Sequence, residues 1–133
     1  METPTILVCD DEADIVSALR IYLEAEGYRV LTAANGKEAV AIVSRESVQL
    51  VVMDIMMPVM NGYEATKMIR SLDREDAKKI PIIAMTANAF TEDRIRAKEA
   101  GMNEHVAKPV DVELLIKVIH KSVSYTHLRA HET

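Results

Sequence analysis

The sequence has 133 residues, the length of one domain, and 49% of them are hydrophobic, as in an ordinary globular protein. Its 16 lysine and arginine residues against 21 aspartate and glutamate residues give a net charge of −5, which argues against nucleic acid or a membrane as a partner. The single Cys9 excludes an internal disulfide bond, and neither a signal-peptide pattern nor a membrane-spanning run is found, so we expect a cytoplasmic protein.

The first half of the chain predicts two strand–helix pairs. The apolar run Ile6–Cys9 is typical of a strand buried on both faces, and a helix is expected over residues 12–26, ended by Gly27. The more mixed run Tyr28–Thr32 predicts an edge strand, and Asn35 is expected to open a second helix. The apolar faces of these two helices are expected to carry Ile15, Leu19, Tyr22, Leu23, Ala39, Val40 and Val43.

The second half repeats this alternation three times. Apolar runs predict two more buried strands, Leu50–Met53 and Ile82–Met85, and a short last strand is expected over His105–Ala107. A helix is expected after each strand. The residues that mark these helices are Ala65, Ile69 and Leu72 after the loop that ends at Gly62, then Thr91 and Gly101, then Asp111, Val112, Leu115, Ile116 and Ile119.

Alternating strands and helices predict a doubly wound α/β fold with right-handed crossovers. In such a fold the carboxyl ends of the parallel strands meet at one edge of the sheet, where ligands bind. Polar residues follow four of the five predicted strands at this edge: Asp10, Asp11 and Glu12, then Asp54, Thr86, and Lys108 with Pro109.

These polar residues point to phosphoryl chemistry. Three carboxylates at one edge repel one another unless a cation joins them, and Mg²⁺ takes oxygen ligands from one or two carboxylates and a phosphate. Lys108 and the Thr86 hydroxyl would add contacts to the oxygens of a phosphoryl group. Asp54 is then the expected nucleophile, and the product would be an aspartyl phosphate.

Five stretches of the chain, in order, resemble the receiver domain of two-component response regulators (CheY-like): ILVCDDE, VVMDIMMPVMNGYEA, PIIAMTANAF, AGM and HVAKPV. The resemblance covers nearly all of residues 5–122. Two stretches, MTANAF and AGMNEHVAKPV, are most similar to receivers of hybrid sensor histidine kinases. The resemblance implies a flavodoxin-like (βα)5 three-layer sandwich with a parallel five-stranded sheet of order 2-1-3-4-5.

The resemblance also implies a metal site and a phosphorylation site. Asp54 matches the phosphoacceptor, which takes its phosphoryl group from a phosphohistidine on a histidine kinase or histidine phosphotransfer protein. Asp11 matches the carboxylate that binds the metal directly, and Asp10 matches its neighbour, which often acts through water. Met56 matches the position whose backbone carbonyl binds Mg²⁺, for which Mn²⁺ can substitute.

Other matched positions concern the switch. Thr86 matches the hydroxyl that moves to the phosphoryl group, and Lys108 matches the lysine that pairs with it. Pro109 matches a proline that follows a cis peptide bond. Asn88, like Met56, matches a position beside the path of attacking water. The family's switch aromatic falls on His105, a departure that puts the usual coupling between hydroxyl and aromatic ring in question.

The resemblance implies a phosphorylated receiver that signals by contact with a downstream protein and catalyses only its own phosphorylation and dephosphorylation. Two other functions compete with this one. A Mg²⁺-dependent phosphohydrolase would normally show an Asp-x-Asp pattern after the first strand, whereas Asp10 is followed by Asp11 and Glu12. A receiver-like binding module that is never phosphorylated is disfavoured because every site residue is present.

The receiver domain is expected to cover residues 1–123. Residues 124–133 depart from the family pattern, and we expect them either to extend the last helix or to have been added by cloning or sequencing. The parent chain is either a separate regulator or a hybrid histidine kinase.

Overall fold

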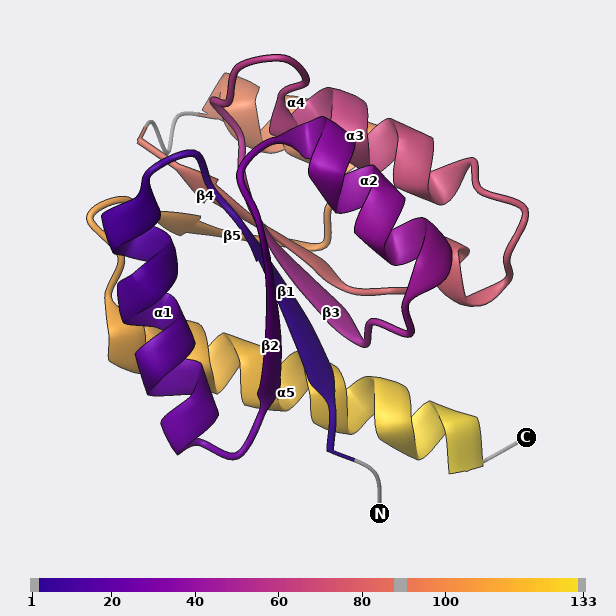
Figure 1. Ribbon diagram of the computed structural model, residues 1–133. Helices are drawn as coiled ribbons and strands as arrows, with labels where there is room; N and C mark the ends of the chain where they lie inside the picture. Colours follow the sequence, from indigo (N-terminus) through magenta and orange to yellow (C-terminus); the bar gives the residue numbers. More distant parts are fainter. Residues whose placement is uncertain (1–2, 88–90, 132–133) are drawn as a thin grey trace.

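A parallel five-stranded sheet forms the centre of the molecule (Figure 1). The computed structural model describes residues 3–87 and 91–131, and it describes side chains through residue 123 except those of residues 91 and 92. The strands follow the order β2-β1-β3-β4-β5, which confirms the expected topology. They are β1 (Thr5–Cys9), β2 (Arg29–Ala33), β3 (Leu50–Asp54), β4 (Ile82–Thr86) and β5 (Glu104–Ala107).

Helices cover both faces of this sheet, with α1 and α5 on one side and α2, α3 and α4 on the other (Figure 1). No helix among the described residues is both long and apolar enough to cross a membrane. The helices are α1 (Ala13–Ala25), α2 (Gly36–Arg45), α3 (Gly62–Arg70), the short 3₁₀ helix η1 (Asp76–Lys78), α4 (Thr91–Ala100) and α5 (Val112–His131).

Neighbouring residues of one strand enter different cores. Leu7 and Val51 pack with the side chains of α2 and α3, whereas Ile6 and Val52 pack with those of α1 and α5. Because successive side chains of a strand point to opposite faces, a strand covered on both sides must be apolar throughout. This arrangement explains the unbroken apolar runs in the sequence.

Side-chain caps fix where the helices begin. The Asn35 side chain accepts a hydrogen bond from the Glu38 N–H at 2.9 Å, and Asn61 forms a reciprocal capping box with Glu64. Asp111 likewise accepts from the Leu114 N–H at 3.2 Å. Such caps satisfy backbone donors that have no partner within the helix, and those at Asn35 and Asp111 confirm the predicted helix starts.

Several details differ from the predictions. Tyr22 was expected on the buried face of α1 but is 50% exposed, because Leu19 and Leu23 fill the contact with the sheet. Helix α3 ends before Leu72, and η1 follows it without a clear signal in the sequence. Strand β2 lies at the sheet edge as predicted, shifted by one residue toward Ala33.

Candidate functional site

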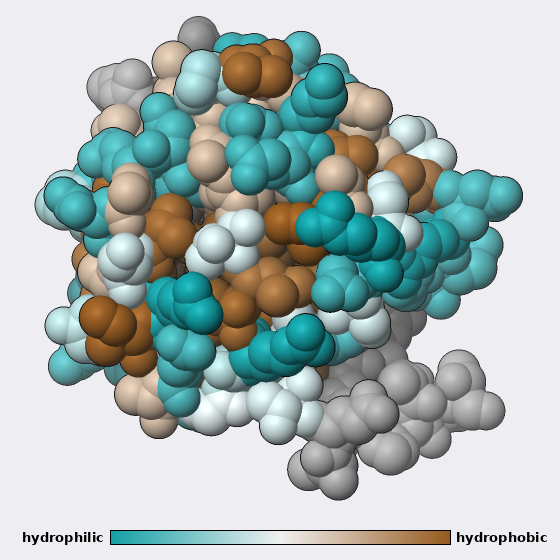
Figure 2. Space-filling model, in the orientation of Figure 1, coloured by the Kyte–Doolittle hydropathy of each residue, from teal (hydrophilic) through white to brown (hydrophobic). Residues whose placement is uncertain are grey.

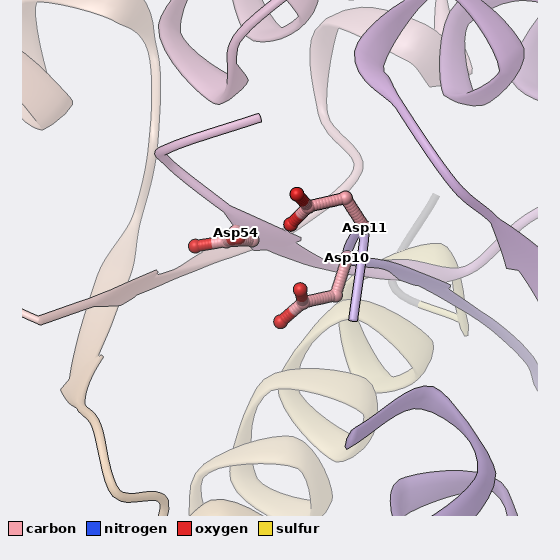
Figure 3. A group of neighbouring side chains, drawn as sticks. All are labelled: Asp10, Asp11 and Asp54. Carbon is pink, nitrogen blue, oxygen red and sulfur yellow. The ribbon is translucent and has the colours of Figure 1, made fainter. Parts of the chain in front are cut away.

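The carboxyl ends of β1 and β3 bring three aspartates together (Figure 3). The two strands pair directly, with Cys9 opposite Met53, so the residues that end or follow them meet at the sheet edge. Asp10, Asp11 and Asp54 each offer a carboxylate oxygen, and these oxygens all lie within 4.8 Å of one another. The expected acidic cluster is therefore present.

Lys108 closes the site from the end of β5. Its ammonium lies 2.9 Å from Asp10 Oδ2 and 3.3 Å from Asp54 Oδ1. The peptide bond between Lys108 and Pro109 is cis, as the resemblance implied. The Lys108 side chain is only 16% exposed, so its charge acts on both aspartates with little screening by water.

Asp10 is buried and still has capacity for a cation. Its Oδ1 accepts a hydrogen bond from the Glu12 N–H at 3.0 Å. Its Oδ2 makes no aligned hydrogen bond among the described residues, although the Lys108 ammonium is close to it. Mg²⁺ takes oxygen ligands from carboxylates, so the three carboxylate oxygens of Asp10, Asp11 and Asp54, all within 4.8 Å of one another, fit a hard divalent ion of this kind.

Burial and charge shift the protonation equilibria of this site. Burial, and then the charge of Asp10, raise the pKa of Asp54 to about 6, although Lys108 and the Met56 backbone N–H act in the opposite direction. For Lys108, burial alone would lower the pKa, but Asp10 and Asp54 outweigh it and the net change is upward. A bound cation would favour the ionised form of Asp54.

Thr86 and Met56 lie beside the cluster. Thr86 ends β4, the strand between those that supply Asp54 and Lys108, and its side chain is buried. The Thr86 carbonyl accepts a hydrogen bond from the Lys108 N–H at 2.8 Å, which ties the two strand ends together. Met56 follows Asp54 by two residues and has a side chain that is 75% exposed.

The two remaining predicted residues lie elsewhere. His105 is half-buried on β5, where it pairs with Ala84, and none of the described contacts joins it to the acidic cluster. Asn88 lies outside the described residues.

Two contributions to the site were missed in the sequence. The Glu12 carboxylate lies 3.8 Å from the Lys108 ammonium, whereas the sequence placed Glu12 at the end of the first strand without a role in the site. A Cβ added to Gly62 would lie 2.5 Å from the Asp54 carbonyl oxygen. Gly62 therefore lets α3 begin directly against the backbone of Asp54, and the only sequence signal was a glycine after the cap Asn61.

A hollow of about 300 Å³ adjoins the aspartates between α1 and the loop that follows β2. Figure 2 shows apolar residues on this side of the molecule, in the region of β2 between α1 and α2. Small side chains, among them Ala13, Ala33 and Ala34, leave this space open, and Asp11 is exposed beside it. The acidic site can therefore be approached from the surface.

Cys9 lies directly behind the site and is fully buried. Its Sγ contacts the Asn35 carbonyl oxygen at 3.2 Å and Met57 Sδ at 3.4 Å. Burial, followed by the charge of Asp10, raises the pKa of the thiol to about 12. Cys9 is thus a packing residue, as a strand residue between apolar neighbours should be.

Fold and site together define an α/β domain with an acidic, lysine-bearing edge. Residues 6–120 match the family model of the response regulator receiver domain. The chain belongs to this family of two-component signalling domains, as its motifs predicted.

Individual relatives agree with this assignment. The chain is 41% identical over 116 residues to an uncharacterised 14.6 kDa protein of Leptolyngbya boryana, a match that covers 87% of each chain. It is 38% identical to the response regulator SaeR of Staphylococcus aureus, and the match covers 85% of this chain but only 48% of SaeR. The chain thus spans about half the length of SaeR.

A solved structure resembles the whole domain. The receiver domain of the sensor histidine kinase PA1611 from Pseudomonas aeruginosa has a TM-score of 0.84 and 34% identity, covering 92% of this chain and 99% of that one. It was solved with a magnesium ion coordinated in its active site cleft.

Proposed function

We propose that this chain is a phosphoacceptor receiver in which Asp54 takes a phosphoryl group from a phosphohistidine. The observation that carries the proposal is the contact of Lys108 with both Asp10 and Asp54 at the edge where the three aspartates meet. The donor would belong to a histidine kinase or histidine phosphotransfer protein, and a downstream protein would read the result.

Asp10, Asp11, Asp54 and the Met56 backbone carbonyl would hold Mg²⁺. When bound, the ion would offset the repulsion between the carboxylates and the phosphoryl oxygens. The position of one oxygen from each of the three aspartates within 4.8 Å of the others supports this assignment.

Transfer needs Asp54 as a carboxylate. One of its oxygens attacks phosphorus, the P–N bond of the phosphohistidine breaks, and the bond pair returns to the ring nitrogen, which takes up a proton. Lys108 is placed to pair with the transferred group because it already contacts Asp54 Oδ1. Thr86 would supply its hydroxyl from the end of β4.

The added charge would then change how β4 and β5 are held. A phosphoryl group that recruits Lys108 and Thr86 would favour one state of an existing equilibrium. In this proposal the domain acts in the cytoplasm. It catalyses its own phosphorylation and dephosphorylation and no other reaction. Residues 1–123 form the receiver, and truncation at Val123 should leave its stability and phosphorylation unchanged, although α5 continues to His131.

The test is incorporation of one phosphoryl group, measured by intact mass after incubation with acetyl phosphate and Mg²⁺. Wild type should gain the group, Asp54→Asn should not, and the exposed control Asp73→Asn should behave as wild type. No adduct in wild type would favour an unphosphorylated binding module, and turnover of phosphate monoesters would favour a phosphohydrolase.

A further inference from the structure

The loop between β3 and α3, residues 55–61, carries Met56 and contains a strained turn. In this turn the Met60 N–H donates to the Pro58 carbonyl oxygen at 2.7 Å, and Val59 between them has a φ of 70°. A hydrogen bond that spans one residue with a positive φ defines the rare and strained kind of γ-turn. Such a conformation persists only where the surrounding structure holds it.

The start of α2 supplies a contact that holds this turn. The Gly36 N–H donates to the Met60 carbonyl oxygen at 3.0 Å. Gly36 is the first residue of α2, so its N–H has no acceptor within the helix and can bond to the loop. α2 and α3 lie on the same face of the sheet (Figure 1), which brings the start of one helix to the loop that precedes the other.

This contact needs a residue without a side chain. A Cβ added to Gly36 would lie 2.5 Å from the Met60 carbonyl oxygen and 3.0 Å from both Met60 Cγ and Ala65 Cβ. Gly36 is helical and does not have a positive φ, so alanine would suit its backbone, and helix propensity would favour alanine. The close approach of Met60, and not conformational freedom, therefore accounts for the glycine.

The loop would yield to an added side chain before the helices do. Both α2 and α3 are anchored in the core by several buried side chains. The turn lies at the surface, where Val59 is 79% exposed and Met60 is half-buried. Displacing Met60 would release the turn and loosen the segment that begins at Met56, whose N–H bonds the Asp54 carboxylate.

We propose that Gly36 is a positioning residue for the candidate metal site. Its N–H and its lack of a side chain hold the strained turn at Val59, and the turn keeps Met56 in place beside Asp54. The inference rests on the proposed function in one respect, namely that Met56 helps to hold Mg²⁺. A glycine that served only the packing of α2 would affect stability without affecting the metal.

The first experiment measures the Mg²⁺ dissociation constant by NMR titration of backbone amide shifts. The test variant is Gly36→Ala, and the matched control is Gly27→Ala. Gly27 has a φ of 93°, so alanine there costs stability, but a Cβ at Gly27 would meet no atom within 4 Å. Gly27 also precedes β2, at the edge of the sheet opposite to the aspartates.

We expect Mg²⁺ to bind Gly36→Ala about tenfold more weakly than wild type, and to bind Gly27→Ala within about twofold of wild type. A dissociation constant that is unchanged in Gly36→Ala would overturn the proposal. So would equal losses of affinity in the two variants, because the loss would then follow stability and not position.

A second pair of variants tests the turn itself, and it does not depend on the folding of Gly36→Ala. Val59→Pro forbids the positive φ, because proline fixes φ at about −65°, whereas Val59→Asn tolerates it. Mg²⁺ should bind Val59→Pro about tenfold more weakly than wild type, and Val59→Asn within about twofold. Wild-type affinity in Val59→Pro would mean that the turn does not position the site, and the proposal would be wrong.

A double-mutant cycle without divalent ions tests whether Gly36 holds the turn. Val59→Asn should raise the urea midpoint of wild type, because asparagine tolerates the left-handed conformation. In the Gly36→Ala background, where the turn is already released, the rise should be about half as large or smaller. Equal rises in the two backgrounds would show that Gly36 does not hold the turn.

Phosphoryl incorporation from acetyl phosphate, measured in parallel, separates this proposal from the proposed function. If wild type takes up no phosphoryl group but the Mg²⁺ affinities and the cycle are as expected, the proposed function fails and the role of Gly36 stands. If wild type is phosphorylated and Gly36→Ala binds Mg²⁺ as wild type does, only the role of Gly36 is wrong. Wild type that binds no Mg²⁺ would contradict both.

Discussion

The Lys108 ammonium lies 3.3 Å from Asp54 Oδ1, although their strands, β5 and β3, are not neighbours in the sheet. β4 runs between them, so Lys108 reaches past the end of a whole strand to make this contact. The same ammonium lies 2.9 Å from Asp10 Oδ2. One cation thus offsets the charge of two buried aspartates.

Lys108→Met should destabilise the protein at pH 7 by about 2–4 kcal/mol, because it leaves two buried carboxylates without their cation. Methionine keeps most of the aliphatic stem, so the loss reports on charge. Urea unfolding without divalent ions measures it. The loss should shrink near pH 4, because Asp54, whose pKa is raised to about 6, is then protonated. The exposed control Lys117→Met should change stability by less than about 0.5 kcal/mol. A variant as stable as wild type at pH 7 would contradict the role given to Lys108.

Asp54→Asn should stabilise the metal-free protein at pH 7.5. The pKa of Asp54 is raised from 3.8 to about 6, so the folded state binds this proton more tightly than the unfolded chain. The free energy of unfolding of wild type therefore falls as pH rises from about 4 through 6. Asparagine has no such proton to lose, so at pH 7.5 the variant should be more stable than wild type by on the order of 1–3 kcal/mol. Urea unfolding at pH 4 and pH 7.5 tests this. An equal effect of the substitution at both pH values would show that the proton of Asp54 is not the cause.

Mg²⁺ should raise the melting temperature of wild type, and a chelator should reverse the effect. An ion that binds only the folded state, and is present at a concentration of about 100 times its Kd, adds about 2.7 kcal/mol of stability. Asp11→Asn should lose most of this gain because it removes one of the three clustered carboxylates. Asp73→Asn, exposed and outside the cluster, should keep it. Full stabilisation of Asp11→Asn by Mg²⁺ would place the ion elsewhere.

Val59→Asn should stabilise the protein by about 0.5–1.5 kcal/mol. Val59 has a φ of 70°, a left-handed conformation that strains a β-branched residue and that asparagine tolerates. Its side chain is 79% exposed, so little packing is lost. Urea unfolding measures the gain. The control Val59→Ala, which keeps a Cβ in the same conformation, should gain less stability. Equal gains for the two variants would show that asparagine does not specifically relieve the backbone strain.

His105→Ala should leave phosphoryl incorporation within about twofold of wild type, since no described contact connects His105 with the carboxylates or with Lys108. Discrimination between partner proteins should weaken, because His105 lines a hollow between α4 and β5. Intact mass after incubation with acetyl phosphate measures the first outcome, and binding to a panel of candidate partner proteins measures the second. Loss of phosphorylation would mean that His105 acts on the site itself.

The central strands and the acidic edge could be predicted from the sequence, because a strand that is buried on both faces appears in the sequence as a continuous apolar run. β1, β3 and β4 each contain four apolar residues in a row, and each run is followed by a polar residue of the site. The edge strand β2 was placed one residue early, since its burial is partial and its pattern correspondingly weak.

What the sequence did not reveal depends on contacts between distant segments. The Arg70 guanidinium donates to the carbonyl oxygens of Ala77 and Gly101 and to the Asn103 side chain, joining α3, η1 and the loop before β5. An arginine in the last turn of a helix has no local feature that identifies such partners. A hollow between α4 and β5 was missed for the same reason, because residues of the helix, of the strand and of the loop between them line it together.

The buried Cys9 makes the natural chain a convenient background for labelling. A thiol with a pKa of about 12 and no exposed surface is almost wholly protonated near neutral pH, and the thiolate is the reactive form. Since Cys9 is the chain's single cysteine, a new cysteine at an exposed position such as Ser47 would be the one group that maleimide reaches. Fluorescent or spin probes could then report on the domain without any change to the strand that carries Asp10.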